Sequence, residues 1–432
     1  GFVFAAIRYG LALMPRVALR VPAKKIAALV ALAAGVFYLL LSGGNVATER
    51  AFVMVAVMLG AVLFDRRALS LRSVAIAATI LLISQPETMM EPGFQMSFAA
   101  TVALVAGFGA LRGRMQPHRM PRWGAAVFTL VFSSLLAGFA TAPIAAAHFN
   151  RVAGYGLIAN LMAVPVMGTA VMPAAVMAAV LAPLGLEAPA LWVMEQGTRW
   201  ILWVAGFVAG LDGAVRAVPS PAPWVLPLLG FGALWTLLWR GPVRFVGAAP
   251  VVAAFAIWSM AQRPPVLISG DGGLVGLRGG GARALSADKG GGFTALQWLE
   301  NDGDLADQAG AAARPGFDGP KAARRFEVAG WRGVQIKGKG AEAALPGACA
   351  VADLVITTAK VSVAPPGCQV IDAGVLAQTG ALAIWPQPDG SLILEPTQQA
   401  VRLWSAGLRI SHIRTAPPMT IRRSAVLTAR TP

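Results

Sequence analysis

Histidine, cysteine and charged side chains are all scarce in this chain of 432 residues. There are three histidines (His118, His148 and His412), two cysteines, and 13% charged residues. So little charge excludes an ordinary soluble protein of this size. Three scattered histidines cannot build a His-rich catalytic zinc cluster, which excludes a nuclease or hydrolase that depends on one.

Hydrophobic residues, by contrast, make up 56% of the chain, and the mean hydropathy is +0.65. Apolar runs of roughly 17–25 residues are typical of transmembrane helices, and such runs are nearly continuous up to the sequence "QRPPV" at 262–266. Beyond it the runs shorten and turn residues recur. We therefore predict a polytopic all-α membrane domain over 1–262, with about 8–10 helices, some short or broken, and a small soluble α+β domain over 263–432.

The charges of the loops predict an orientation in the membrane. The loops 15–25, 65–72 and 112–122 are basic and alternate with neutral or acidic ones, which places them in the cytoplasm by the positive-inside rule. Continuing the count puts the soluble domain outside the cytoplasm. Segment 189–211 could instead lie in the interface, which would put that domain in the cytosol, but would also place the basic "RGPVR" at 240–244 outside.

The start of the chain carries no targeting signal that we can recognise. Residue 1 is Gly rather than Met, and no charged segment precedes an apolar one. We expect a preceding region to be missing.

The stretch "MEPGFQMSFAATVALVAGFGAL" at 90–111 carries Gln95 and Ser97 just inside an apolar helix that begins at Pro92. Proline suits the first turn of a helix, where its missing N–H would be unpaired anyway. One interpretation is a capped helix end at the membrane interface. The other is a helix N-terminus that faces a polar cavity and offers its dipole to an anion.

Two further sites place polar or helix-breaking residues within apolar segments. Asn160 and Pro165 lie in the segment 155–176, where a proline either kinks the helix or frees backbone groups that line a pathway. Glu195 and Arg199 have the spacing of an i,i+4 ion pair. That pair is a functional site, a structural pair or part of an interfacial helix. His148 is predicted to lie in a loop near the outer face.

Three blocks of sequence resemble the ComEC family of competence proteins. They are 42–73, with a Ser-Gly-rich link and a basic loop, "PGFQMSFAATVAL" at 92–104, with Met96 where the family has Leu, and 141–168, with "TAP", "FNR" and "NLMAVP". They occur in the family's order.

The resemblance implies an inner-membrane channel that imports single-stranded DNA during natural transformation. The residues that match its motifs are Arg50, Gln95, Ser97, Asn160 and Pro165, and we add the Glu195 and Arg199 pair as candidates for the DNA path. The expected partners are single-stranded DNA, the lipid bilayer and other competence proteins, with no cofactor. The oligomeric state stays open.

Two other classes of protein fit this sequence less well. A secondary transporter of a small solute would also use broken helices and intramembrane charges, but it would carry internal inverted repeats, and none is apparent in this sequence. A membrane-embedded enzyme would need a convergent Ser/His/Asp set or a His-Glu-x-x-His motif, and neither is present.

The family resemblance implies a metallo-β-lactamase-like domain after the last helix, but only His412 lies in the tail. We therefore expect no nuclease centre and interpret 263–432 as a reduced relative of that domain. The patterns predict hairpins over 264–280 and 380–396, a strand followed by a helix over 283–304, and two strands within 349–374.

Cys349 and Cys368 lie near the predicted strand edges of the tail. Outside the cytoplasm they could form a disulfide, whereas a cytosolic tail would leave two thiols. The basic stretch 414–432 is expected to be a frayed end or a weak surface contact.

Overall fold

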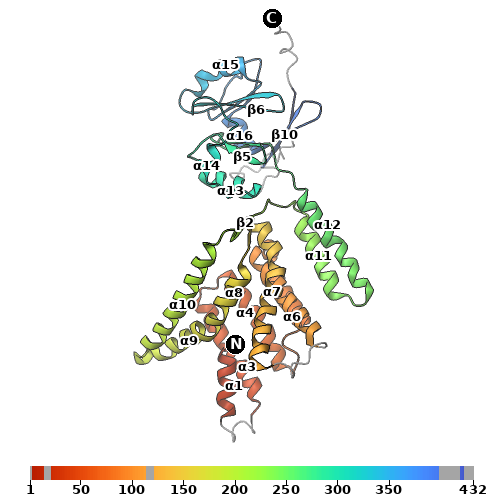
Figure 1. The fold of residues 1–432 in the computed structure, drawn as a ribbon, viewed down its shortest axis with the longest axis vertical. Helices are drawn as coiled ribbons and strands as arrows, with labels where there is room; N and C mark the ends of the chain where they lie inside the picture. Colours follow the sequence, from red (N-terminus) through yellow and green to blue (C-terminus); the bar gives the residue numbers. More distant parts are fainter. Residues whose placement is uncertain (1, 14–20, 113–120, 398–418, 423–432) are drawn as a thin grey trace. The chain divides into compact units, whose positions relative to one another are not determined.

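The computed structural model describes residues 2–13, 21–112, 121–397 and 419–422. The chain divides into two compact units, one of 1–216 with 226–252 and one of 217–225 with 253–432. Each unit is described by itself below (Figure 1).

Helices make up nearly all of the first unit. Among the described residues, six helical segments are long and apolar enough to cross a membrane, which confirms the predicted helical membrane part. The helices are α1 (Phe2–Ala12), α3 (Ala23–Leu41), α4 (Val46–Leu63), α5 (Leu71–Ser84), α6 (Pro92–Arg112), α7 (Arg122–Phe149), α8 (Gly156–Val166), α9 (Met172–Leu181), α10 (Ala188–Ala209), α11 (Val225–Leu238) and α12 (Ala248–Ser259).

Two of the basic segments lie at the same end of these helices. Lys25, in the first turn of α3, pairs with Asp65, just after α4, at 2.7 Å from Nζ to the carboxylate. The antiparallel helices α3 and α4 therefore bring 21–25 and 65–72 together, as a shared cytoplasmic side requires. Part of the third basic loop, 113–120 with His118, lies outside the described residues.

Helix α10 runs back alongside α8 and α9. The strand β1 (Arg151–Ala153), which precedes α8, pairs with β2 (Val215–Ala217), which follows α10. A helix of 22 residues is about 33 Å long. Helix α10 thus ends at the level where α8 begins, after traversing about the thickness of a bilayer.

The tail contains two β-sheets. The first has the strand order β12-β11-β10-β3-β4-β5 and the second β6-β7-β8-β9. The strands are β3 (Val266–Ile268), β4 (Val275–Gly279), β5 (Ala282–Leu285), β6 (Ala323–Val328), β7 (Trp331–Ile336), β8 (Leu354–Thr357), β9 (Gln369–Ile371), β10 (Leu382–Pro386), β11 (Leu392–Pro396) and β12 (Met419–Ile421).

The buried residues arrange these sheets in four layers. Apolar side chains of both sheets, among them Ile268, Trp331 and Ile384, form one core between them. Helix α15 (Ala341–Val351) covers the outer face of the second sheet. Helices α13 (Gly292–Asp302) and α14 (Gln308–Ala312) cover that of the first. The predicted α+β class of the tail is confirmed.

Local predictions for the tail agree with the structure in part. The hairpins β3–β4 and β10–β11 and the strand β5 followed by α13 are present where predicted. Cys349 was wrongly placed near a strand edge, since it lies in α15. The frayed end was also wrong for Met419–Ile421, which pairs with β11 because its backbone completes that edge of the sheet.

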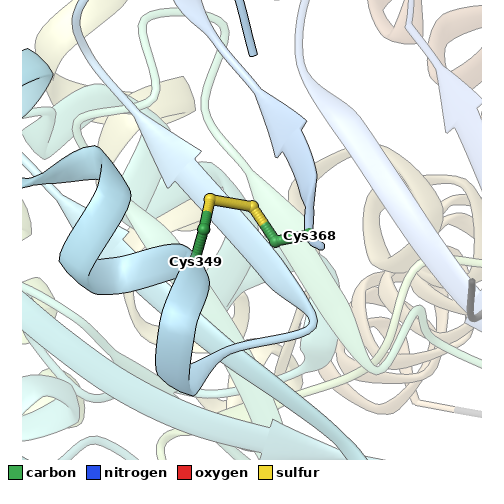
Figure 2. The surroundings of a disulfide bond; sticks show 2 residues. All are labelled: Cys349 and Cys368. Atoms are coloured by element: carbon green, nitrogen blue, oxygen red, sulfur yellow. A yellow bond between two sulfur atoms is a disulfide. The ribbon is translucent and has the colours of Figure 1, made fainter. Parts of the chain in front are cut away.

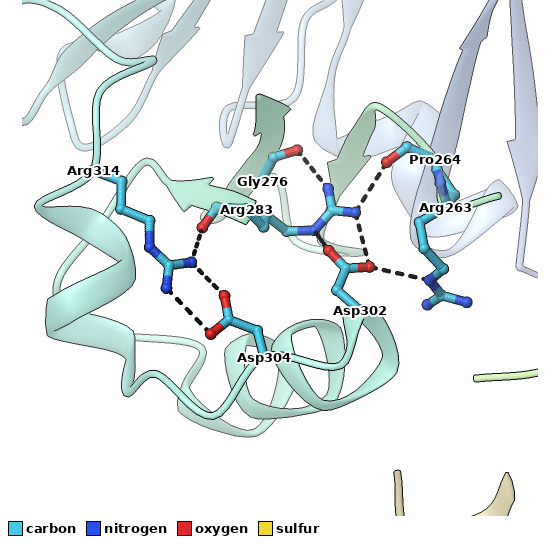
Figure 3. A network of polar contacts seen from close by, with 7 residues as sticks. All are labelled: Arg263, Pro264, Gly276, Arg283, Asp302, Asp304 and Arg314. Atoms are coloured by element: carbon cyan, nitrogen blue, oxygen red, sulfur yellow. Dashed lines mark hydrogen bonds and ion pairs between the residues drawn. The ribbon is translucent and has the colours of Figure 1, made fainter. Parts of the chain in front are cut away.

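A buried ion pair fixes one end of the first sheet (Figure 3). Arg283 has a fully buried side chain that donates to both carboxylate oxygens of Asp302 and to the carbonyls of Gly276 and Pro264. Arg263 donates to the same carboxylate at 3.0 Å. Burial lowers the pKa of the Arg283 guanidinium, while Asp302 acts to raise it. Because nearly all its donors are used, this cluster is structural.

Candidate functional site at the start of helix α6

The start of α6 is held by a polar side chain that bonds in two directions. A short 3-10 turn (Pro86–Met90) leads into α6. The Gln95 side chain reaches back, and its Nε2 donates to the carbonyl of Met89 at 3.0 Å. Its Oε1 lies 2.9 Å from Nε2 of His148, which belongs to the last turn of α7. Gln95 thus joins the start of one helix to the end of the next.

Arg50 approaches the same turn from α4. Its guanidinium lies 3.9 Å from the Glu91 carboxylate, and its side chain is only 14% exposed. A methyl group added to Gly93 would lie 2.7 Å from Nη2 of Arg50. Glycine at this position therefore leaves the space in which the guanidinium rests against the backbone of α6.

A third polar contact connects α4 with α5. Asn45 caps α4 by accepting from the Thr48 backbone N–H at 2.9 Å, and Glu49 follows in the first turn, where a negative charge is favourable. The Glu49 carboxylate accepts from Nε2 of Gln85, just after α5, at 3.0 Å. Four helix ends thus meet in one set of polar side chains, here named the helix-end cluster: Glu49, Arg50, Gln85, Glu91, Gln95 and His148.

An apolar core lies directly beneath this cluster. Phe94 and Phe98 of α6 are buried against Val74, Ala77 and Leu81 of α5. Their rings lie 4.4 Å apart. This packing fixes the first two turns of α6, so that the polar side chains above it have a rigid base.

The charge of the cluster limits its chemistry. It has two carboxylates, Glu49 and Glu91, and one guanidinium, Arg50. Within the described part of the chain, no group of three His, Cys, Asp or Glu side chains gathers to hold a metal ion. The arrangement offers hydrogen-bond donors and acceptors at a helix end and positions Arg50.

Ser97 and Asn160 lie near this level but not in the cluster. Ser97 is half-buried one turn into α6, and its carbonyl accepts from the Thr101 hydroxyl at 2.8 Å. Asn160 is exposed in the second turn of α8, and its side chain has no hydrogen-bond partner among the described residues.

Pro165 does not interrupt its helix. The chain stays helical through a five-residue π-helical segment, Met167–Val171, that joins α8 to α9. The carbonyl of Pro165 accepts from the Thr169 hydroxyl at 2.7 Å, and Trp200 of α10 donates to the carbonyl of Met162 at 3.1 Å. Side chains thus supply partners for the backbone around the proline, as membrane helices require.

Glu195 and Arg199 form the ion pair that their spacing predicts, 2.7 Å from Nη2 to Oε1. Both side chains are more than half exposed. The neighbouring Gly197 is buried on the other face of α10, where an added methyl would lie 2.6 Å from Val171. The pair therefore points away from α8 and α9, and no contact joins it to the helix-end cluster.

The sequence patterns indicated Arg50 and Gln95 but not the partners that hold them. Glu49, Gln85 and Glu91 were not proposed, although Gln85 and Glu91 each precede a proline at a helix boundary. His148 was wrongly placed in a loop. Helix α7 continues through it to Phe149, and the following Asn150 has the left-handed φ of 56° typical of a helix terminus.

The two cysteines of the tail are joined by a disulfide in this structure (Figure 2). Cys349 belongs to α15 and Cys368 immediately precedes β9, so the bond ties the outer helix to its sheet. His412 lies outside the described residues.

Comparison with known proteins gives a family model and two relatives that agree with one another. The family model described as Competence protein matches residues 1–243. The chain is 28% identical over 320 residues to "Competence protein ComA" of Neisseria gonorrhoeae, covering 64% of this chain and 43% of the relative. It is 25% identical over 191 residues to "ComE operon protein 3" of Bacillus subtilis (strain 168), covering 44% of this chain and 24% of the relative. No solved structure matches.

Proposed function

The chain belongs to the competence protein family, and from this premise we propose that it is an inner-membrane channel that imports single-stranded DNA during natural transformation. The chain spans less than half the length of either curated relative. The proposal concerns the membrane part, where the family match lies.

The observation that carries the proposal is the helix-end cluster. It gathers polar side chains at the ends of four apolar helices, above a packed core and within the matched residues. Lipid would penalise such groups, whereas a hydrated opening would accept them. The Arg50 side chain is largely buried in the protein, so we assign it a positioning role at the start of α6. Gln95, Ser97 and Asn160 are the proposed lining of the DNA path.

Single-stranded DNA suits a path of this composition. Passage without sequence readout needs hydrogen-bond partners and a few cations along the phosphates. Pro165 comes just before the π-helical segment, and we propose that this segment shapes the wall of the path. Glu195 and Arg199 point away from α8 and α9, so we leave this pair out of the proposed path. A small-solute transporter is not favoured, because the relatives are competence proteins.

We further propose that the tail lies outside the cytoplasm. The disulfide suits an oxidising compartment. The basic ends of α3 and α4 lie opposite the helix-end cluster, and α10 ends at the level where α8 begins. The absence of a nuclease centre in the tail stays a prediction.

The test is transformation frequency with marked DNA in cells that depend on this protein. Ser97→Leu and Asn160→Leu should each reduce it by tenfold or more, with normal protein levels in the membrane. Ile158→Leu, at an exposed apolar position on α8, serves as the control. If the transformation frequency were unchanged in both variants, these residues would not line the DNA path. Unchanged frequency after deletion of the gene would remove the competence role.

A further inference from the structure

Helix α10 has two opposite faces, of which only one is covered by neighbouring helices. On the covered face, Gly197 and Val204 are buried. Successive residues of a helix are turned by about 100°, so the opposite face carries a strip, here named the outer strip, made of Trp192, Glu195, Arg199, Leu202 and Gly206. The four side chains of the outer strip are each more than half exposed. A methyl group added to Gly206 would meet nothing within 4 Å among the described residues.

The ion pair of the outer strip lies at the depth of the bilayer centre. A methyl group added to Gly197 would lie 2.6 Å from Val171, which is near the middle of Gly156–Leu184, an apolar segment long enough to cross a membrane. Glu195 and Arg199 are each two residues from Gly197, or about 3 Å along the helix axis. Charged side chains at this depth face protein or a water-filled cavity rather than lipid.

The contact between Glu195 and Arg199 does not remove the need for a further partner. It joins one guanidinium nitrogen to one carboxylate oxygen at 2.7 Å, and the two side chains are 52% and 69% exposed. A guanidinium has five N–H donors, and a carboxylate can accept at both of its oxygens. Much of this hydrogen-bonding capacity therefore points outward, where lipid offers no partner. A neighbour that satisfies it must present both a negative and a positive group.

The spacing of the outer strip is that of a seam between two helices. Its residues follow one another in steps of three, four, three and four, which is the a/d pattern of a coiled coil. Apart from the ion pair, the strip is apolar at Trp192 and Leu202 and has no side chain at Gly206. Small residues let membrane helices approach closely. This pattern favours a second helix, rather than water, against the outer strip.

We propose that the outer strip of α10 is the interface through which two copies of this chain associate in the membrane. Copies inserted in the same direction are related by a two-fold axis along the membrane normal, so the two α10 helices run parallel and the same surface meets itself. Each Arg199 then lies between its own Glu195 and the partner's Glu195. The four charges alternate in sign, and each gains a second opposite neighbour. The outer strip is thus complementary in charge to itself.

Cysteine crosslinking of the full chain in its native membrane tests this interface. Leu202→Cys and Gly206→Cys place a thiol on the outer strip, whereas Phe207→Cys places one at nearly the same depth, exposed but about 100° round the helix from Gly206. The two natural cysteines are already joined to each other. Because a disulfide forms only between closely placed residues, oxidation should give about tenfold more covalent dimer from the two strip variants than from Phe207→Cys. Little dimer from both strip variants, or as much from Phe207→Cys, would overturn the proposal.

Charge reversal identifies a second copy as the neighbour. Glu195→Arg makes the outer strip carry two positive charges, and Arg199→Glu makes it carry two negative ones, so each variant should repel its own copies. Recovery of an untagged copy with a tagged one should fall about tenfold for either variant alone. When the two variants are expressed together, the positive strip should pair with the negative one and restore the recovery.

Other neighbours of the outer strip would give different results. If it lay against another part of the same chain or against a different protein, mixing the two reversed variants would not restore recovery. If α10 lay in the membrane surface with this strip in water, a membrane-impermeant thiol reagent would label Gly206→Cys, and no dimer would form. Either result would overturn the proposal. The cysteine variants keep both charges and decide the question if a reversed chain fails to insert. None of these measurements uses DNA, so they are independent of the proposed transport function.

Discussion

The guanidiniums of Arg283 and Arg50 each face a carboxylate, but in very different surroundings. Arg283 and Asp302, in the tail, have side chains 0% and 2% exposed, and their closest atoms lie 2.7 Å apart. Arg50 and Glu91, at the helix ends, are 3.9 Å apart, and Glu91 is 41% exposed. The first pair is sealed by further hydrogen bonds, whereas the second is open on one side.

This difference distinguishes an ion pair that stabilises the fold from a polar cluster that does not. A buried ion pair persists only if its donors and acceptors are satisfied, and breaking it leaves an uncompensated charge. An open polar cluster contributes little stability, so its persistence in an apolar domain needs another reason. We infer that the tail network holds the fold and that the helix-end cluster serves transport. The predictions below test this contrast, from the largest expected effect to the smallest.

The largest effect is expected for Asp302→Ala. It removes the carboxylate from buried Arg283, and the free energy of unfolding of the tail should fall by about 3–5 kcal/mol. Urea titration of the full chain in detergent, followed by pulse proteolysis of the tail, measures the change. Asp288→Ala removes the exposed partner of Lys321 and should change little. Equal losses in the two variants would refute a special role for the buried pair.

The disulfide between Cys349 and Cys368 should come next. It closes a loop with a sequence separation of 19, and its loss should cost the tail about 3 kcal/mol. The same urea titration with and without reductant measures this. In intact cells, thiol alkylation without reductant should leave both cysteines unmodified. Alkylation of both would place the tail in a reducing compartment and overturn the proposed orientation.

Gly93→Ala tests the helix-end cluster with a single methyl group. The methyl would meet the end of the Arg50 side chain, which can move away, so α6 should stay folded while Arg50 loses its place. We expect transformation to fall about tenfold, equivalent to about 1.4 kcal/mol. Gly109→Ala is the matched control, since nothing lies within 4 Å of the added methyl on the same helix. Equal frequencies for both variants would leave Arg50 without a role.

The smallest effect is expected for Arg314→Gln. Arg314 donates to Asp304 and holds the pKa of that carboxyl below its usual value. The stability from this pair is present above the ordinary pKa and is lost as pH falls through the lowered pKa of Asp304. The variant should be less stable by about 1 kcal/mol or less at pH 7, and the difference should shrink well below about pH 4 to the part that comes from the hydrogen bond between Arg314 and the carbonyl of Arg283. A constant difference at all pH values would exclude the ion pair as its cause.

Short-range sequence patterns predicted the elements whose formation depends on neighbouring residues, namely helices, a helix start and a turn. The apolar runs gave the membrane helices, Pro92 marked the start of α6, and Asp389-Gly390 marked the β10–β11 turn. Strands β8 and β9 lie within 349–374, where two strands were predicted. Their parallel pairing with each other and with β7 was not predicted, because it crosses long connections that leave no short-range signature.

The candidate site was predictable only in part for the same reason. Gln95 stood out as a polar residue in an apolar helix, but its partner His148 is 53 residues away. Gln85 and Glu49 are 36 residues apart and meet only because α4 and α5 are antiparallel neighbours. Helix packing, rather than spacing, selects these pairs.

The central claim is that DNA passes the polar end of α6 and α8, and crosslinking tests it most directly. A photoreactive amino acid at position 97 or 160 would be activated while radiolabelled DNA is being taken up by competent cells. The same group in place of Phe37, an exposed apolar residue of α3, is the control. We predict label on the protein from positions 97 and 160 but not from position 37. Label from position 37 alone, or from none of the three during active uptake, would contradict the proposed path.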